Sequence, residues 1–411
     1  MSSNDPTRVE AFRIDVEEAG QLIADNMPQY GSISVPLAEA TGQILRQKII
    51  AERDQPPFDR ATMDGIAVAA TDLAGGTRAF KFDGIQAAGQ PAKACNGPGH
   101  CLEVMTGAVM PTGTDTVVPV ERINVADDVA TLENGYEATP GQFIHGCASD
   151  HAQGDVLLEP GTHIDGAEMA ILTAAGQANV EIARWPKIAI ISTGDELVDV
   201  GEAIEDYQIR SSNDRALQAS LERHGCKQSM RAWLPDDPDK LLQQVGTLHA
   251  DNDVLVLSGG VSMGKYDYVP GILKELGVKL IFHKILQRPG LPMWFGISAD
   301  NKPVFALPGN PVSTLVCFVR YVLPAIESAM GAMPPVRLQL PLADAIDFEP
   351  DLCWFLPVAL KPGDDGIPCA EPRPTNTSGD FIGLRGTDGF VALPRAESHF
   401  PEGFRADFYP W

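Results

Sequence analysis

DVLVLSGGVSMGKYD, residues 253–267, is the stretch that decides the fold class of this chain. Its apolar run Val254–Leu257 and the following Ser258 lead directly into Gly259 and Gly260. A short apolar run bounded by glycines is typical of a buried strand in a parallel sheet. Glycines at the carboxyl end of such a strand let the backbone come close to a bulky anion, because no Cβ stands in the way. The stretch therefore predicts a site for a phosphate-bearing ligand at the edge of a parallel sheet.

Strands and helices alternate on both sides of this stretch, from Lys187 to about Met330. The predicted strands are KIAIIS, MRAWL, DVLVLS, VKLIFHKIL, MWFGIS and VFAL. The predicted helices lie near Asn213–His224, after Asp237-Pro238, near Val269–Leu276 and from Asn310-Pro311 onward. Alternation of this kind implies a mostly parallel sheet with helices on both faces.

The rest of the chain has a different pattern. Capping-box signatures that begin at Asp15 and Asp165 predict two helices, the first over residues 15–26. Between them, residues 55–140 are rich in Gly, Pro, Asp and Thr with brief apolar runs, which favours a small all-β module. Short strands and turns return after Pro334-Pro335 and predict a second β module at the C-terminus.

Composition limits the classes of function. The chain has 411 residues, 44% hydrophobic and 21% charged, as expected for a soluble globular protein of several domains. Its formal net charge of −24 argues against non-specific nucleic-acid binding, which requires a positive surface. The same charge repels anions, so a phosphate site has to be built locally from backbone amides, a few cations or a bound metal ion.

The start of the chain, the apolar segments and the cysteines predict a cytoplasmic protein. The start of the chain shows no signal-peptide pattern. The longest apolar segment, Val312–Ile326, is interrupted by Arg320 and Pro324, so no membrane span is expected. The seven cysteines are scattered without metal-ligand spacing, which favours reduced thiols.

Three loops of the α/β segment follow predicted strands, and such loops meet at the carboxyl edge of a parallel sheet. They are Ser192–Glu196, Ser258–Gly260 and Pro308–Pro311. Glu196, Asp236 and Asp267 are expected at the same edge, where carboxylates commonly hold Mg²⁺ that bridges phosphate oxygens. For Asp236 the alternative remains open that it only helps to cap the next helix.

Other polar residues are candidates for contacts with an anion. Asn310-Pro311 supplies a cap and a first-turn proline, so Ser313 and the amides of that turn would face the loop edge. Arg288 offers a guanidinium for a phosphate. The first β module has two polar loops, which contain Asp59 and Thr106. Their residues alone predict ordered loops and assign them no function.

Successive motifs resemble one family over essentially the whole chain. They are PPFDRATMDG, TGAVMPTGTDTVVPVE, STGDEL, SNDR, PDDP, SGGVSMGKYDY, RPGLP and LPGNPVS. Each is moderately specific, and the ordered set resembles the molybdopterin molybdotransferases of the MoeA type, which are related to the gephyrin C-terminal region.

The resemblance implies a multidomain fold of α/β and β domains. The expected domains are an elongated α+β dimerisation domain (1–54 and 141–183), an inserted β-domain (55–140), a three-layer α/β molybdopterin-binding domain (184–332) and a C-terminal β-barrel-like domain (333–411). It also implies a homodimer whose active site combines the α/β domain of one subunit with the inserted β-domain of the other.

The implied reaction is Mg²⁺-dependent insertion of molybdate into adenylylated molybdopterin, with release of AMP and molybdenum cofactor. A molybdopterin adenylyltransferase and molybdoenzyme-maturation proteins are possible partners; nucleic acid and membrane are not.

Carried onto the matching positions, the resemblance and the loops together give three sets of candidate residues. The expected catalytic residues are Asp59, Thr106, Glu196, Asp236 and Asp267. The expected Mg²⁺ ligands are Glu196, Asp236 and Asp267. The expected substrate-binding residues are Gly194, Ser258, Gly259, Gly260, Ser262, Arg288, Pro308, Gly309, Asn310, Pro311 and Ser313.

The chain departs from the family pattern at several positions: Lys265 and Ser211 each replace a residue that is often acidic, and two cations expected near the oxyanion are missing. Leu291 stands where the family has a lysine, and Pro357 stands where it commonly has an arginine. Each lost charge-assisted hydrogen bond costs roughly 1.5–3 kcal/mol of molybdate binding. The alternatives to a full transferase are therefore a molybdopterin-binding paralogue or carrier with weak molybdate insertion, a non-catalytic scaffold of the gephyrin kind, and an adenylyltransferase of the related α/β domain.

Overall fold

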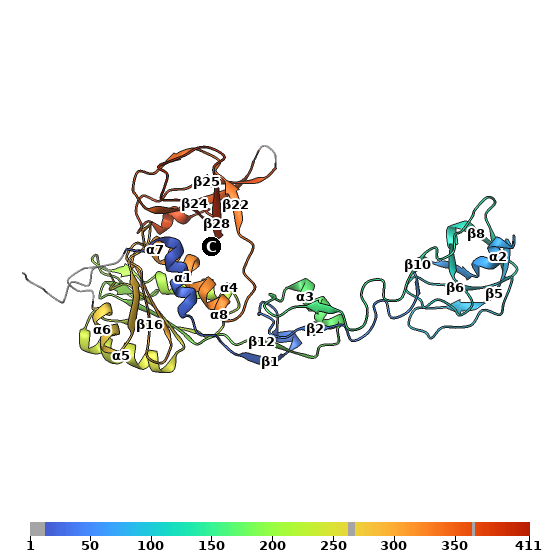
Figure 1. Ribbon diagram of the computed structural model, residues 1–411, viewed down its shortest axis with the longest axis horizontal. Coiled ribbons are helices and arrows are strands. Elements are labelled where there is room, and N and C mark those ends of the chain that lie inside the picture. The colour runs from blue at the N-terminus through green and yellow to red at the C-terminus, as the bar shows by residue number, and fades with distance from the viewer. Residues whose placement is uncertain (1–12, 262–267, 364–365) are drawn as a thin grey trace, which may run out of the picture. The chain divides into compact units, whose positions relative to one another are not determined.

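The computed structural model describes residues 13–261, 268–363 and 366–411. Two of the candidate site residues, Ser262 and Asp267, lie outside these ranges, as does Lys265. The chain divides into two compact units (Figure 1). The first unit comprises residues 1–47, 160–169 and 179–411, and the second comprises residues 48–159 and 170–178. The finer division into four domains stays a prediction.

A six-stranded sheet organises the α/β part of the first unit. Its order is β16 (Ser229–Leu234), β13 (Ile188–Thr193), β17 (Val254–Ser258), β21 (Pro303–Leu307), β20 (Trp294–Ile297) and β18 (Lys279–His283). The first four strands pair in parallel, and β20 pairs antiparallel with both β21 and β18. All five residues of β17 are buried, and burying one Val or Leu side chain contributes about 1.5–3 kcal/mol. The predicted, mostly parallel sheet is therefore confirmed.

Helices cover both faces of this sheet (Figure 1). Ile188 and Ile190 of β13 pack into one apolar cluster, while the alternate residues Ala189 and Ile191 pack into another. The helices of the first cluster are α1 (Val16–Asn26), α4 (Asn213–Arg223), α7 (Pro311–Cys317) and α8 (Leu323–Ala329). Those of the second are α5 (Pro238–Asp251) and α6 (Val269–Glu275). Because side chains alternate along a strand, each face of β13 serves one cluster.

The long helix predicted after Asn310 is not uniform. A π-helical segment, Phe318–Val322, separates α7 from α8. Pro324 follows it and has no N–H to donate to a preceding carbonyl, which favours this irregular winding. By length and composition alone, the window Pro311–Ala329 is long and apolar enough to cross a membrane. Because 78% of that window is buried inside the protein, this stretch is a core helix.

A second six-stranded sheet, made of five strands in sequence of pairing and a sixth at the side, forms the C-terminal part of the first unit. Its members are β19 (Gln287–Arg288), β24 (Cys353–Pro362), β26 (Gly389–Leu393), β28 (Arg405–Pro410) and β22 (Leu338–Pro341), with β25 (Pro368–Pro372) beside β24. β19 comes from the α/β part, and its Arg288 pairs with Trp354 of β24. This pairing brings Arg288 to the C-terminal sheet, across 66 positions of sequence.

Smaller elements complete the first unit. They are β1 (Ser32–Pro36) with β12 (Asn179–Ala183), β14 (Leu197–Val198) with β15 (Ile209–Arg210), β23 (Ile346–Asp347) with β27 (His399–Phe400), and the 3₁₀ helices Leu37–Glu39 and Phe381–Leu384. Helix α3 (Gly166–Ala174) contains residues of both units.

The second unit contains another six-stranded sheet. Its order is β7 (Thr116–Pro119), β4 (Gly65–Val68), β6 (His100–Val104), β5 (Ala79–Gln86), β9 (Val129–Leu132) and β8 (Ile123–Ala126). Its other elements are β2 (Ile49–Ile50) with β11 (Val156–Leu158), β3 (Arg60–Ala61) with β10 (Ile144–His145), α2 (Ala70–Ala74) and the 3₁₀ helix Val120–Arg122. The predicted β character of residues 55–140 is confirmed.

The predicted helix starts have different caps. Asp237 caps α5, because its side chain accepts a hydrogen bond from the N–H of Lys240. At Asp165 the Glu168 carboxylate accepts from the Asp165 N–H at 3.0 Å, which is one half of the predicted capping box. Helix α1 begins where expected, but Asp15 makes no side-chain cap bond. That part of the prediction is wrong.

Candidate functional site

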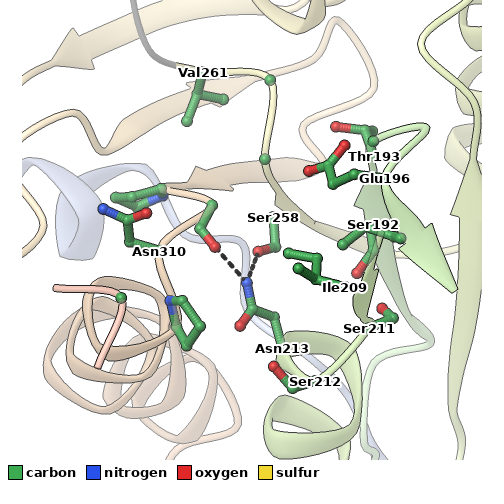
Figure 2. A pocket seen from close by; sticks show the side chains of 18 of the residues that line it. Ser192, Thr193, Glu196, Ile209, Ser211, Ser212, Asn213, Ser258, Val261 and Asn310 are labelled. Atoms are coloured by element: carbon green, nitrogen blue, oxygen red, sulfur yellow. Dashed lines mark hydrogen bonds between the residues drawn. The ribbon is translucent and has the colours of Figure 1, made fainter. Parts of the chain in front are cut away.

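A cavity of about 850 Å³ lies at the carboxyl ends of the parallel strands in the first unit. Figure 2 shows its lining, and we call it the strand-edge cavity. It brings together most of the residues expected to bind substrate or metal: Gly194, Glu196, Asp236, Ser258, Gly259, Gly260, Pro308, Gly309, Asn310 and Pro311. All three loops that follow β13, β17 and β21 contribute, as expected for an open parallel sheet.

The turn after β17 requires its two glycines. Both have positive φ angles, 99° at Gly259 and 66° at Gly260. A Cβ at Gly259 would lie 2.8 Å from the carbonyl oxygen of Thr193, and one at Gly260 would lie 2.8 Å from Cγ2 of Val269. Since either contact is too short, only glycine fits at both positions. The backbone of this turn is thus exposed to the cavity without side chains.

A partly buried polar network forms the floor of the cavity (Figure 2). The side-chain nitrogen of Asn213, at the start of α4, donates to Ser258 Oγ at 2.9 Å and to the carbonyl of Gly309 at 2.8 Å. Thr314 lies 3.4 Å from Ser258 Oγ and donates to the carbonyl of Pro308 at 2.5 Å. Sequence reasoning missed Asn213, which lines the cavity, and Thr314, which contacts the lining residues Ser258 and Pro308. The sequence signal for Asn213 was its place in the motif SNDR. The motif by itself does not say which groups the Asn213 side chain contacts.

Two carboxylates line the same cavity. Glu196 bends back over Gly194, where an added Cβ would lie 2.6 Å from its Oε2. Asp236 precedes α5, and its N–H donates to Asp195 Oδ1 at 3.1 Å. The side-chain cap of α5 belongs to Asp237. Among the described residues, no group of three or more His, Cys, Asp and Glu side chains is placed to hold a metal ion. The third expected ligand, Asp267, lies outside the described residues.

The start of α7 is attached to the C-terminal part of the unit. Asn310 makes no side-chain cap; its side-chain nitrogen donates to Ser378 Oγ at 2.6 Å. The N–H of Val312 donates to the Ser378 carbonyl at 3.0 Å. This amide is therefore already used, and the expectation that every amide of this turn faces a ligand is wrong at Val312.

Arg288 and Ser313 line a second cavity of about 640 Å³, which we call the aromatic cavity. It shares Pro292, Pro308 and Asn310 with the strand-edge cavity. Its aromatic lining residues are Phe348, Trp354 and Phe355. The rings of Phe348 and Trp354 stack at 4.5 Å, and the Arg288 guanidinium lies 5.9 Å from the Phe348 ring centre. Leu291 and Pro357 line the same cavity, so these two departures from the family pattern lie at one place.

Buried groups brace the loop that carries Arg288. Gln287 is fully buried; its nitrogen donates to the Pro289 carbonyl at 3.0 Å, and its oxygen accepts from the Tyr321 hydroxyl at 2.5 Å. Burial raises the pKa of Tyr321 well above its ordinary value, so this hydroxyl keeps its proton. A Cβ at Gly290 would meet Cys317 Sγ at 2.4 Å. The loop therefore has little room to shift.

Asp59 and Thr106 belong to the second unit, and both are exposed. The Asp59 carboxylate accepts from the N–H of Cys147 at 2.7 Å. Thr106 donates both its N–H and its hydroxyl to Asp64 Oδ1, at 2.6 and 2.8 Å. These two hydrogen bonds lower the pKa of Asp64. Asp64 is thus the direct partner of Thr106, a pairing that the sequence did not indicate.

Family profiles match the chain along most of its length. "MoeA N-terminal region (domain I and II)" matches residues 14–176, "Probable molybdopterin binding domain" matches residues 189–328, and "MoeA C-terminal region (domain IV)" matches residues 339–411. A protein of Synechocystis named molybdopterin molybdenumtransferase is 39% identical over 97% of this chain and 100% of its own length. A Staphylococcus aureus protein of the same name is 30% identical over 96% of this chain and 94% of its own length.

Solved structures agree with these relatives. Two crystal structures of the molybdopterin biosynthesis MoeA protein from Pyrococcus horikoshii superpose with TM-scores of 0.79 and 0.81. They are 29% and 26% identical in sequence, and each covers 97% of this chain with 99% and 100% of its own length. The chain therefore belongs to the MoeA family, the molybdopterin molybdenumtransferases of molybdenum cofactor biosynthesis.

Proposed function

We propose that this protein inserts molybdate into adenylylated molybdopterin in the presence of Mg²⁺ and releases AMP and molybdenum cofactor. The observation that carries the proposal is the pair of adjoining cavities, which share Pro292, Pro308 and Asn310. One offers a bare glycine turn and two carboxylates, and the other offers aromatic rings, one guanidinium and a buried serine. A ligand with a phosphate part and a planar ring part requires both kinds of lining.

The strand-edge cavity suits the phosphate part. The turn at Gly259 and Gly260 allows close approach of a phosphate oxygen, because no side chain intervenes. Glu196 and Asp236 are the described residues that would hold Mg²⁺, since hard cations prefer carboxylate oxygens. When bound, the ion would offset the negative charge of the phosphates in this acidic chain. Asp267 is proposed as a third ligand from the family resemblance alone.

The aromatic cavity suits the pterin ring and the oxyanion. Phe348 and Trp354 present aromatic surface, and Arg288 and Ser313 supply donors to molybdate oxygens. Leu291 and Pro357 supply none. Asp59 and Thr106 of the second unit are proposed to act in a homodimer, where they would complete the site of the other subunit. We also propose a cytoplasmic location, with a molybdopterin adenylyltransferase and molybdoenzyme-maturation proteins as partners.

Purified protein tests this function directly. Incubation with adenylylated molybdopterin, Mg²⁺ and graded molybdate should release AMP in proportion to molybdate insertion. Glu196→Ala should reduce the AMP release strongly, whereas Glu202→Ala, on an exposed loop outside the strand-edge cavity, should leave it unchanged. AMP release that does not depend on molybdate would contradict the proposal.

The second candidate function is a molybdopterin carrier with weak molybdate insertion. The observation that favours it is that Arg288 is the one charged side chain among the described residues of the aromatic cavity. A carrier would bind molybdopterin tightly and release no AMP at micromolar molybdate. The same titration therefore separates the two candidates.

Mixed dimers test the shared site. Asp59→Ala and Glu196→Ala subunits are each expected to be inactive alone, but hybrid dimers would contain one intact site. Mixing them should restore part of the activity, and no recovery with verified subunit exchange would rule out the shared site.

A further inference from the structure

Thr193, the last residue of β13, has a buried hydroxyl with no hydrogen-bond partner among the described residues. The residue is 5% exposed, and it lines the strand-edge cavity. Buried hydroxyls are normally hydrogen-bonded, because an unpaired one loses its contacts with water without compensation. An orphan hydroxyl at the wall of a cavity therefore points to a partner that the cavity binds.

The place of this hydroxyl within the cavity is specific. A Cβ at Gly259 and a Cβ at Gly260 would each lie 3.1 Å from Thr193 Oγ1. The hydroxyl thus lies against both glycines of the bare turn. Figure 2 shows Thr193 and Glu196 on the same side of the cavity. A ligand oxygen that approaches the glycine turn would meet this hydroxyl directly.

The neighbouring strand provides a comparison. Ser258 ends β17, pairs in register with Ser192 of β13 and is also buried. Its hydroxyl accepts from Asn213 and is satisfied within the protein. Thr193, one residue further along β13, has no such internal partner among the described residues. Among the described residues, one strand-end hydroxyl is thus satisfied within the protein, and the other has no partner and lies against the glycine turn.

We propose that Thr193 is a ligand-binding residue whose hydroxyl donates a hydrogen bond to a phosphate oxygen of the ligand held at Gly259 and Gly260. The inference deepens the proposed function and rests on it, because it requires a phosphate-bearing ligand in the strand-edge cavity. Threonine is a neutral donor, so it adds a contact to an anion without adding charge. Hydrogen bonds to charged groups are stronger than neutral ones, so losing this one should weaken binding about tenfold or more.

The test compares the full-length wild-type protein with Thr193→Val, which keeps the β-branched shape and removes only the hydroxyl. AMP, pyrophosphate and adenosine serve as probes, with dissociation constants from calorimetry in the presence of Mg²⁺. Thr193→Val should bind AMP and pyrophosphate about tenfold more weakly, while any adenosine affinity should be unchanged. Thr193→Ser should restore binding. The melting temperature of the ligand-free variant should stay within about 2 °C of wild type, because the Thr193 hydroxyl makes no hydrogen bond with the described part of the chain.

Tyr30→Phe is the matched control. Its hydroxyl is another buried orphan among the described residues, but Tyr30 does not line the cavity. The control should therefore leave AMP binding unchanged. If the wild-type protein binds AMP and the Thr193→Val variant binds it equally well, the assignment of Thr193 is overturned, but the phosphate site is not. A melting temperature that falls by more than about 5 °C would show an internal structural bond and overturn it as well. A wild-type protein that binds neither AMP nor pyrophosphate would overturn the phosphate site of the proposed function itself.

Discussion

Asn213 donates a hydrogen bond to the hydroxyl of Ser258 across 2.9 Å and so ties the first turn of α4 to the end of β17. The same nitrogen donates to the carbonyl of Gly309, which follows β21. One side chain thus joins three separate segments at the floor of the strand-edge cavity. Since Gly309 and Ser258 both line that cavity, the shape of the cavity depends on this amide.

Asn213→Ala should therefore weaken both the fold and the site. Two hydrogen bonds are lost, and two acceptors are left without a donor, at a cost of about 1–3 kcal/mol in the free energy of unfolding. Binding of AMP should weaken several-fold, because Gly309 loses its anchor. Urea unfolding and calorimetry measure the two effects. Ser212→Ala is the control: it changes the neighbouring cavity residue, whose side chain makes no cap bond, and it should have little effect on the free energy of unfolding.

Gly259→Ala should disrupt the turn after β17. The new Cβ would lie 2.8 Å from the Thr193 carbonyl, and alanine is strained at a φ of 99°. Strain of this kind costs roughly 1–3 kcal/mol of stability, and AMP binding should fall at least tenfold. Gly271→Ala is the matched control, because it lies in α6 with nothing within 4 Å of an added Cβ. It should stabilise the protein by roughly 0.5–1 kcal/mol. A Gly259→Ala variant that binds AMP normally would contradict the close packing of the turn.

Leu291→Lys should strengthen molybdate binding. Leu291 is half-buried in the aromatic cavity with Arg288 and Ser313, so a lysine there adds one cation close to the expected oxyanion. One charge-assisted hydrogen bond corresponds to about a tenfold lower apparent dissociation constant. The molybdate dependence of AMP release gives this value. Leu338→Lys, at an exposed position of strand β22 outside the cavity, controls for the change in net charge. Equal effects of the two variants would mean that only the overall charge matters.

The stability of the first unit should depend on pH through Asp253. Its carboxylate is partly buried, which acts to raise its pKa, but hydrogen bonds from the Lys187 N–H and the Arg184 guanidinium hold the pKa below its ordinary value. The unfolded chain then binds the proton more tightly than the folded protein. The carboxylate therefore stabilises the fold above the unfolded pKa near 3.8, and this contribution is lost as the pH falls through the folded value.

Asp253→Asn should consequently reduce the free energy of unfolding at pH 7. Because the side chain is 31% exposed, we expect the lower part of the usual range, roughly 1–2 kcal/mol. The difference between variant and wild type should shrink as the pH falls below about 4. Urea titrations at a series of pH values measure it. A difference that stays constant down to pH 2 would exclude the carboxylate as its source.

The local elements were the most predictable part of the fold. The apolar run at Val254 predicted β17, and Asp237-Pro238 predicted the start of α5, because strand burial and helix capping depend on residues close together in sequence. The glycine turn was predictable for the same reason. The break in the long helix at Phe318–Val322 was not predicted, although Pro324 was visible. Proline is tolerated in several helical geometries, and packing selects one of them.

The order of its residues alone predicted a mostly parallel sheet with a glycine turn at the end of one strand, and it carries the motifs of one family. Periodicity, caps and motifs are local, so they can be seen without the fold. Only the tertiary structure decided which residues form hydrogen bonds with these cavity and loop residues. Asn213 reaches Gly309 across 96 positions, Asn310 reaches Ser378 across 68, and Thr106 reaches Asp64 across 42. Nothing in the sequence near one member of such a pair specifies the other, because the contact exists only after strands and loops from distant segments have packed together.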